Sequence, residues 1–347
     1  MGLYDKRGYL SIPSILNFNM SFNYVWGGRG TGKTYGALKY CIENNKKFVY
    51  MRSLQTQLDC IKKEELSPFK SINRDMDIDI KPKSITKNLS AFYYTELKND
   101  KVYFIGEPKG YAMALSTVAN LRGFDASDVE ILIYDEFIPE KRERKVESAG
   151  YSFKNAYETM NRNRELNGIK PIQCLLFSNS ENLACDIFIE NGLMNKVNSM
   201  DINRKEMSIL KERSIGLFNL CNSPISKEKE KTTLYIMSGK DSDFARMAIG
   251  NEFYNTDRTC IKKVNLIEYK PICKVDVITI YEHKSNNMLY VSSVYSGKCK
   301  EFSKSVKDLK AFRKYYSWIY EEYLLDNVEF QDITCKSLLE IYFKEKF

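Results

Sequence analysis

The sequence contains a single histidine, His283, and none of its nine cysteines stands in a Cys-x-x-Cys pair. Structural zinc sites use clusters of these two residue types, so the pattern predicts no zinc centre. The cysteines are odd in number and scattered, and Cys174 lies in an apolar run where a thiol acts as a small hydrophobic side chain. We therefore expect reduced thiols in a cytoplasmic protein.

Long hydrophobic runs are also missing. No apolar stretch approaches the roughly 20 residues that a helix needs to cross a membrane. The first ten residues, MGLYDKRGYL, lack the apolar core of a signal peptide. We expect a soluble protein that stays inside the cell and has no membrane partner.

Length and charge set limits but do not identify a function. The 347 residues are enough for two domains. Lys and Arg number 53 against 45 Asp and Glu, a formal net charge of +8, and such a surplus suits a nucleic-acid partner. A coding sequence rich in A and T would also raise the lysine count, so the charge is informative only where it gathers at a site.

Residues 27–34 read GGRGTGKT and match the pattern G-x-x-x-x-G-K-[S/T] in full. An apolar stretch at 22–26 precedes them and a helical stretch follows, which is the strand–loop–helix context of a phosphate-binding P-loop. Glycines turn backbone N–H groups toward an anion, the lysine reaches the β- and γ-phosphates, and the last hydroxyl suits Mg²⁺. The residues predicted to bind ATP are Gly27, Gly28, Arg29, Gly30, Thr31, Gly32, Lys33 and Thr34.

The apolar residues 131–134 end in Asp135 and Glu136, about a hundred residues after the loop. We expect Asp135 to orient Mg²⁺ through its bound water. Glu136 is expected to polarise the attacking water, since water near pH 7 needs an aligned base. A strand end with two solvated acids is the alternative. With a further strand at 47–53 between the motifs, the pair favours the P-loop class that has an additional strand and a catalytic glutamate.

Polar residues near a third apolar run, 172–180, complete the predicted site. Asn179 lies at the end of this run and is expected to sense the γ-phosphate or the attacking water, unless it only forms a turn. Arg162 and Arg164 precede the run, and either suits a bidentate contact to a neighbouring subunit's phosphate. A solvated helix end is the alternative for both. Arg52, at the end of the second strand, is a further candidate for a subunit contact.

Two basic segments are candidates for gripping a phosphate backbone without reading its sequence. One contains Arg122, and the other, after the paired acids, contains Lys141, Arg142, Arg144 and Lys145. Solvated loops are the alternative for both segments. A third segment at 227–231 alternates in sign as KEKEK, and we interpret it as solvated linker.

The order of these motifs predicts an α/β fold. Apolar runs alternate with helical stretches, which is typical of a parallel sheet with helices on both faces. We assign residues 1–197 to a P-loop ATPase domain, 198–230 to a linker and 231–347 to a smaller, β-rich α+β domain. In the last of these, two strands are expected to flank a hairpin turn at 284–287, and long helices close the chain. In the first, two strand-like stretches are expected to flank a turn at 99–100.

Together the motifs resemble one known family, the DNA-encapsidation ATPases of small tailed bacteriophages of the podovirus type. Order and spacing agree through roughly residues 15–185, and the likeness is weaker beyond them. The matching segments are GRGTGKT at 28–34, FVYMR at 48–52, DEFI at 135–138, RNRE at 162–165 and CLLFSN at 174–179.

The resemblance implies a homo-oligomeric ring, a pentamer, at the portal vertex of the empty capsid. The ring would push double-stranded DNA inward as ATP is hydrolysed. Docking through an RNA scaffold is implied by the family alone. The protein would work in the host cytoplasm, transiently on the capsid, and be absent from the mature virion.

For individual residues, the resemblance implies ATPase roles for Lys33, Thr34, Asp135 and Glu136. It implies a trans-acting role for Arg162, with Arg164 as the second choice, and the sensor position for Asn179. The family's second domain resembles an RNase H-like nuclease that has lost its active site. Asp276 lies in the strand-like stretch 275–282, but we find no convincing second and third acid beside it. Two-metal cleavage needs clustered carboxylates, so we expect no nuclease activity.

Two other functions compete with a DNA-translocating motor. A helicase-like or repair ATPase would act on single strands, although the sequence shows no additional series of helicase motifs. A nucleotide-dependent scaffolding module would bind without translocating, and it would not need the carboxylate of Glu136. Stimulation of ATP hydrolysis by duplex or by single-stranded DNA separates the first two.

Overall fold

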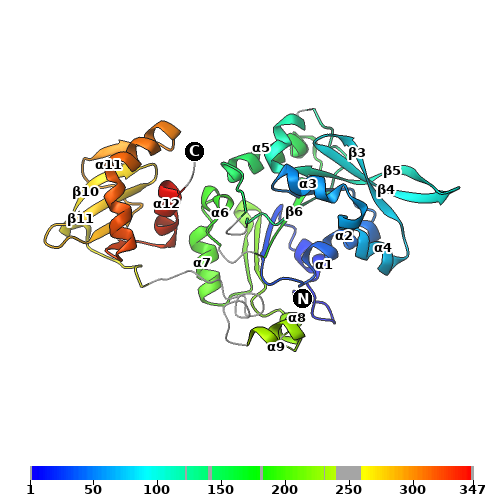
Figure 1. Cartoon of the computed structure of the whole chain (residues 1–347), viewed down its shortest axis with the longest axis horizontal. Coiled ribbons are helices and arrows are strands. Elements are labelled where there is room, and N and C mark those ends of the chain that lie inside the picture. Colours follow the sequence, from blue (N-terminus) through cyan, green and yellow to red (C-terminus); the bar gives the residue numbers. More distant parts are fainter. Residues whose placement is uncertain are drawn as a thin grey trace. The chain divides into compact units, whose positions relative to one another are not determined.

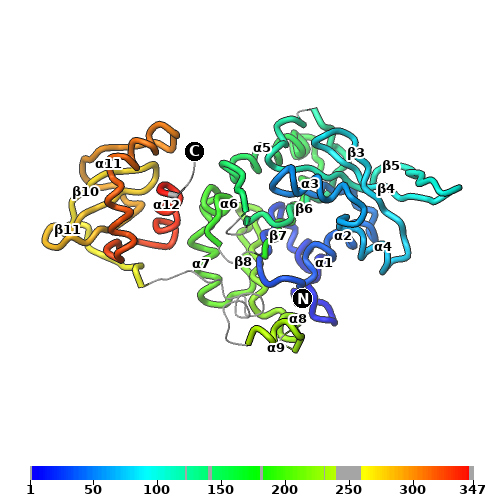
Figure 2. The backbone as a smooth tube through the Cα atoms, viewed as in Figure 1, coloured from blue at the N-terminus to red at the C-terminus, as the bar shows by residue number. Residues whose placement is uncertain are grey.

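The computed structural model describes residues 2–121, 123–139, 143–179, 183–229, 231–239 and 259–344. The chain forms two compact units, each with its own β-sheet (Figures 1 and 2). The first unit comprises Met1–Asn191 and Ser199–Tyr254. The second comprises Gly192–Asn198 and Asn255–Phe347.

The described part of the first unit is built on a nine-stranded sheet. Its strands are β1 (Phe22–Trp26), β2 (Phe48–Arg52), β3 (Ile80–Thr86), β4 (Leu89–Lys98), β5 (Lys101–Ala114), β6 (Ile131–Asp135), β7 (Gln173–Ser178), β8 (Met207–Leu210) and β9 (Ile215–Asn219). They lie in the order β3-β4-β5-β2-β6-β7-β1-β9-β8. From β5 to β9 in that order every neighbouring pair is parallel, and antiparallel strands flank both ends.

Helices precede, connect and follow these strands. They are α1 (Ile12–Leu16), α2 (Lys33–Glu43), α3 (Gln55–Ile61), α4 (Lys70–Met76), α5 (Ala149–Asn161), α6 (Asp186–Glu190), α7 (Met194–Ile202), α8 (Pro224–Lys229) and α9 (Thr233–Ser238). Turns of 3-10 helix are η1 (Glu64–Leu66), η2 (Leu115–Leu121), η3 (Glu165–Asn167) and η4 (Lys211–Arg213). The α2 helix begins at the lysine of the predicted phosphate loop.

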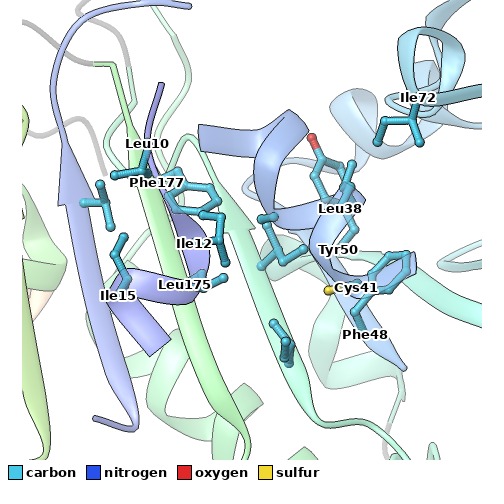
Figure 3. Close-up of a cluster of buried hydrophobic side chains, with 14 of the residues drawn as sticks. Leu10, Ile12, Ile15, Leu38, Cys41, Phe48, Tyr50, Ile72, Leu175 and Phe177 are labelled. Atoms are coloured by element: carbon cyan, nitrogen blue, oxygen red, sulfur yellow. The ribbon is translucent and has the colours of Figure 1, made fainter. Parts of the chain in front are cut away.

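The central strands are largely apolar because helices cover both faces of the sheet. On one face, Leu38 of α2 lies in one buried cluster with Tyr50 of β2 and Phe177 of β7 (Figure 3). On the other face, the ring of Phe188 in α6 lies 5.4 Å from that of Tyr24 in β1. The predicted α/β fold with a parallel-rich sheet is confirmed.

The β4–β5 hairpin confirms the predicted turn at Asn99 and Asp100. Both residues have positive φ angles, 49° and 57°, as a tight two-residue hairpin turn requires. Lys98 and Lys101 pair directly across it. Figure 1 shows the tip of this hairpin reaching beyond the rest of the first unit.

We expected the segment 198–230 to be a linker, but it is part of the sheet of the first unit. It supplies β8 and β9, and β9 pairs in parallel with β1 along its full length. All five residues of β9 are buried. A strand of five residues gives too short a pattern to stand out between polar neighbours, and its central partner β1 lies almost 200 residues earlier in the chain.

The second unit holds a five-stranded mixed sheet among its described residues. Its strands are β10 (Tyr269–Val275), β11 (Ile278–His283), β12 (Leu289–Ser292), β13 (Lys300–Phe302) and β14 (Val328–Phe330), in the order β13-β10-β11-β12-β14. The helix α11 (Val306–Leu324) lies between β13 and β14 in the chain, α12 (Ile333–Lys344) follows β14, and η5 (Leu266–Glu268) precedes β10. Neither these helices nor any other described helix combines the length and the apolar character needed to span a bilayer.

One predicted hairpin of the second unit is confirmed and one predicted strand is wrong. β11 and β12 pair antiparallel across the expected turn at 284–287. The stretch 275–282 is divided, however, because β10 ends at Val275 and β11 begins at Ile278. Asp276 lies in the turn between them with φ +50°, and it accepts a hydrogen bond from the Tyr342 hydroxyl. A short turn residue flanked by β-branched residues is easily mistaken for part of one strand.

Candidate nucleotide-binding site

The loop from Gly27 to Gly32 joins β1 to α2 and depends on its glycines. Gly27, Gly30 and Gly32 have φ angles of +151°, +67° and +86°, which residues with side chains rarely adopt. A Cβ added to Gly27 would also lie only 2.6 Å from the Cβ of Leu220, the residue after β9. The backbone is thereby held close to β9, and α2 begins directly behind the loop.

Lys33 is folded onto the loop's own carbonyl groups. Its Nζ donates to Gly27 O at 3.1 Å, to Gly28 O at 2.8 Å and to Thr31 Oγ1 at 3.2 Å. Only 5% of the residue is exposed. Burial lowers the pKa of Lys33 to about 7, and the nearby Lys229 adds to this effect, whereas Asp135 and Glu136 oppose it. Among the described residues no carboxylate accepts a hydrogen bond from Lys33 Nζ, and a poorly solvated ammonium group of this kind is suited to receive an anion.

The end of β6 meets the start of α2 at Asp135. Asp135 Oδ1 accepts from Thr34 Oγ1 at 2.8 Å, and Oδ2 accepts from the Tyr50 hydroxyl at 2.7 Å. The carboxylate is buried, with 7% of the residue exposed. The structure therefore joins two motifs that lie 101 residues apart. A hydroxyl and a carboxylate are hard oxygen donors, so these residues fit Mg²⁺.

Glu136 adopts a left-handed conformation with φ +56°. Such a conformation is unfavourable for a residue with a side chain and often occurs at functional sites. Its Oε2 accepts a hydrogen bond from Arg52 Nη2, and Arg52 Nη1 lies 3.3 Å from Asp135 Oδ2. The side chain of Arg52 is 17% exposed. Arg52 thus binds the two acids of its own chain, which differs from the subunit contact that we expected of it.

Asn179 follows β7, and β7 lies between β1 and β6. Ser178 O accepts from Gly27 N at 3.3 Å, and Phe177 O accepts from Phe137 N at 3.0 Å. The end of β7 is therefore tied to both the loop and the acidic strand, and half-buried Asn179 lies at the edge where a sensor was predicted. Arg29 is exposed on the loop itself.

The two arginines after α5 differ in their surroundings. Arg162 has φ +46° and is exposed, and its Nη2 donates to Phe124 O at 3.0 Å. Arg164 is buried, and its Nη2 donates to Ala126 O at 2.8 Å and Ser127 O at 2.7 Å. Arg164 therefore holds the segment before β6 in place, and Arg162 is the better situated of the two to reach a neighbouring molecule.

Of the predicted DNA-gripping residues, Arg122, Lys141 and Arg142 lie outside the described residues. Arg144 and Lys145 are described, and both are exposed. The structure brings together the loop, Asp135, Glu136 and Asn179, and it leaves Arg162, Arg144 and Lys145 on the surface.

Sequence reasoning missed Tyr50 as part of the site. It lies two residues before Arg52, so the two side chains share one face of β2, and β2 is the neighbour of β6. A hydroxyl-bearing residue in an otherwise apolar buried strand was the signal available, but using it requires the strand order.

Comparison with known proteins gives one consistent match. Residues 4–330 match the family described as Podovirus DNA encapsidation protein (Gp16). The DNA packaging protein of Bacillus phage phi29 is 22% identical over 265 residues, covering 75% of this chain and 70% of that protein. The DNA packaging protein of Bacillus phage B103 is 25% identical over 260 residues, covering 72% and 69%.

Two solved structures share the fold over almost the whole chain. One is the Phi-28 gp11 DNA packaging motor, with a TM-score of 0.66 at 17% identity, covering 98% of this chain and 99% of that chain. The other is the bacteriophage Phi-29 viral genome packaging motor assembly, with a TM-score of 0.65 at 15% identity, covering 99% of each.

Proposed function

The chain belongs to the family of podovirus DNA encapsidation proteins, and from this premise we propose that the loop at Gly27–Gly32 and the acids after β6 form its ATPase site. Membership makes the chain a phage DNA packaging ATPase that translocates the genome into the capsid. The observation that carries the site assignment is the 2.8 Å hydrogen bond from Thr34 Oγ1 to Asp135 Oδ1. It links a phosphate loop to an acidic strand end, as phosphoryl transfer from ATP requires.

Binding of ATP would exchange the carbonyl partners of Lys33 for phosphate oxygens. The ammonium group already lies inside the loop, so only a side-chain movement is needed. Thr34 and Asp135 are the residues that would hold Mg²⁺. Bound Mg²⁺ would neutralise part of the negative charge of the phosphates. Gly27 to Gly32 contribute backbone N–H groups, and exposed Arg29 is a further phosphate contact.

Glu136 is the proposed base that aligns the attacking water. In the structure its carboxylate is bound by Arg52, so it must leave that partner, or share it, before it can act on water. Arg52 would then remain beside Asp135. Asn179 would sense the γ-phosphate from the end of β7.

The strand order supports the additional-strand class of P-loop ATPases. β7 separates the loop strand β1 from the acidic strand β6, so the inserted strand is β7. The stretch at 47–53, which we expected between the motifs, forms β2 on the other side of β6. On this basis the ATPase domain extends through β9 to the whole first unit. We propose that the second unit corresponds to the nuclease-like domain without activity. Among its described residues no three His, Cys, Asp or Glu are grouped to hold a metal ion.

The proposed partners are double-stranded DNA, further copies of the chain in a pentameric ring, and the portal vertex, with docking through an RNA scaffold. Exposed Arg144 and Lys145 support a DNA-gripping role for the segment after the paired acids. Arg122, Lys141 and Arg142 are proposed with them from sequence. The protein would act in the host cytoplasm while the capsid fills.

Duplex and single-stranded DNA should be compared as activators of ATP hydrolysis. Duplex DNA should stimulate the wild type, and Lys33→Ala should abolish hydrolysis with either DNA. Lys39→Ala is the matched control, because Lys39 lies on the same helix but pairs with Glu43 at the surface. Stimulation by single strands alone would support a helicase-like ATPase instead.

A mixing experiment tests Arg162 as the residue that acts on a neighbour's phosphate. Arg162→Ala and Glu136→Gln proteins should each be inactive, and mixed assemblies, checked by native mass spectrometry, should recover hydrolysis. Arg164→Ala is the control. It should lower thermal stability, because Arg164 is buried and holds Ala126 and Ser127. No recovery in assemblies shown to be mixed would rule out the trans-acting role.

A further inference from the structure

A second lysine lies at the phosphate loop. Lys229 is the last residue of α8, and its Nζ donates a hydrogen bond to Arg29 O. The same ammonium group occupies the space beside Gly30, where a Cβ would collide with it. The glycine therefore makes room for the lysine as well as for the backbone turn. From the sequence, Lys229 was interpreted as part of a solvated linker.

Two ammonium groups thus contact one loop. That of Lys33 lies inside the loop, and that of Lys229 lies beside Gly30. Lys33 Nζ donates to Gly28 O and Lys229 Nζ donates to the next carbonyl, Arg29 O, so the two cations lie close enough to repel, and the charge of Lys229 lowers the pKa of Lys33. Burial lowers the pKa of Lys229 itself. Within the described part of the chain, no ion pair within 4.0 Å involves Lys229, and its neighbour Glu228 pairs with Lys231 at 3.0 Å instead. Among the described residues, the acids Asp135 and Glu136 act on Lys33, whereas no carboxylate forms an ion pair with Lys229.

The position of Lys229 is fixed by the chain between β9 and α8. Leu220 lies against Gly27, and Ser223 N donates to Leu220 O at 3.2 Å. Pro224 then packs against Gly8, where an added Cβ would lie 3.0 Å from the proline Cβ. Ser226 in α8 is 2% exposed. The segment is anchored at both the loop and the N-terminal turn, so its last lysine is held over the loop by packing.

We propose that Lys229 is a second phosphate-binding lysine, which exchanges the carbonyl of Arg29 for a phosphate oxygen of bound ATP. This inference rests on the proposed ATPase site. The negative charge of the triphosphate would relieve the repulsion between Lys33 and Lys229 and hold α8 against the loop. Nucleotide binding would then be transmitted to the segment that continues from α8 into α9.

The test measures the dissociation constant of a non-hydrolysable ATP analogue with Mg²⁺ by isothermal titration calorimetry on the full chain. Lys229→Gln should weaken binding by about tenfold or more, since a charge-assisted hydrogen bond is lost. Lys229→Arg keeps the charge and should retain most of the affinity. Lys227→Ala, which removes an exposed lysine from the same helix, should bind like the wild type.

A second measurement separates phosphate binding from a structural role. Thermal melts of Lys229→Gln without nucleotide should match those of the wild type, because the lysine is only partly buried. The stabilisation that the analogue with Mg²⁺ adds should be smaller in Lys229→Gln than in the wild type, because fewer groups hold the phosphates. Unchanged or tighter binding by Lys229→Gln would overturn the inference. If Lys33→Ala also bound normally, the proposed ATPase site would fail with it.

Discussion

The two sheets use acidic side chains in opposite ways. In the first, Asp135 and Glu136 gather at one strand end and are bound by Thr34, Tyr50 and Arg52. In the second, acids on separate strands each pair with a lysine near the surface. These pairs are Glu282 with Lys270 at 2.9 Å, Glu301 with Lys274 at 3.1 Å, and Glu329 with Lys262 at 2.6 Å.

The difference shows that a reactive site is marked by acidic side chains that meet at one place, rather than by the presence of acidic residues in a sheet. An exposed ion pair contributes roughly 0–1 kcal/mol to stability and performs no chemistry. A buried carboxylate such as Asp135, which shares one arginine with half-buried Glu136, is costly to maintain. The pair lies at the carboxyl edge of a parallel sheet, where ligands bind in α/β folds, and this position supports the proposed role in the reaction.

The largest effect is expected at Glu136. Glu136→Gln should lower kcat for ATP hydrolysis by about a thousandfold, because the aligned base is lost while the loop still binds nucleotide. Glu282→Gln is the matched change in the second unit and should leave kcat unchanged. Steady-state ATPase assays with duplex DNA measure both. Equal losses of kcat in the two variants would show that the acids of the two sheets do not differ in function.

Removal of Arg52 should have the next largest effect. Arg52→Ala leaves Asp135 and Glu136 without their shared cation, so the free energy of unfolding should fall by about 2–3 kcal/mol. ATP with Mg²⁺ should restore more stability to this variant than to the wild type, because the ion supplies positive charge at the same acids. Thermal melts with and without ligand measure the difference. An unchanged melting temperature of Arg52→Ala without ligand would show that Arg52 does not offset the negative charges of Asp135 and Glu136.

The two units also differ in the direction in which the pKa of a lysine is shifted. Burial lowers the pKa of Lys33 from 10.5 to about 7, whereas the hydrogen bond to Glu329 raises that of Lys262. Between pH 7 and 10 the unfolded chain holds a proton on residue 33 that the folded chain lacks. Lys33 should therefore make the free energy of unfolding rise with pH, by up to about 1.4 kcal/mol per unit.

Denaturant titrations at several pH values test this slope. Lys33→Met should remove it, and the stability of the wild type relative to Lys33→Met should grow from pH 7 to 10. Lys262→Met is the control, since its pKa shift has the opposite sign and creates no such rise. If the stability of the wild type relative to Lys33→Met fell as the pH rose, this result would contradict a lowered pKa of Lys33.

The smallest effect is expected for the cross-strand pair of Lys270 and Glu282. Its side chains are 63% and 31% exposed, so Lys270→Ala should change the free energy of unfolding by less than about 1 kcal/mol. Urea denaturation measures this value. A loss as large as that of Arg52→Ala would mean that surface pairs in the second unit do more than keep it soluble.

Short motifs made much of the candidate site predictable. A phosphate loop and an acidic strand end are defined by neighbouring residues, so Lys33, Thr34, Asp135 and Glu136 could be named from sequence. The partners of these residues could not. Arg52 reaches the acids only because β2 lies beside β6, and Lys229 reaches the loop only because β9 lies beside β1.

The fold shows the same division between local and distant information. The hairpin turns at 99–100 and 284–287 are local and were predicted correctly. β8 and β9 were missed because their pairing depends on distant strands. Arg164 resembled a free surface arginine in sequence, yet the carbonyls that bury it belong to residues 126 and 127.

The late pairing of β9 with β1 has a consequence for how the chain folds during synthesis. The ribosome releases β1 long before Ile215–Asn219 emerges, and until then one edge of β1 has no strand beside it. Leu220 and Lys229 follow β9, so the contacts at Gly27 and Gly30 form later still. The phosphate loop is encoded near the start of the chain, yet it is among the last parts of its unit to be completed.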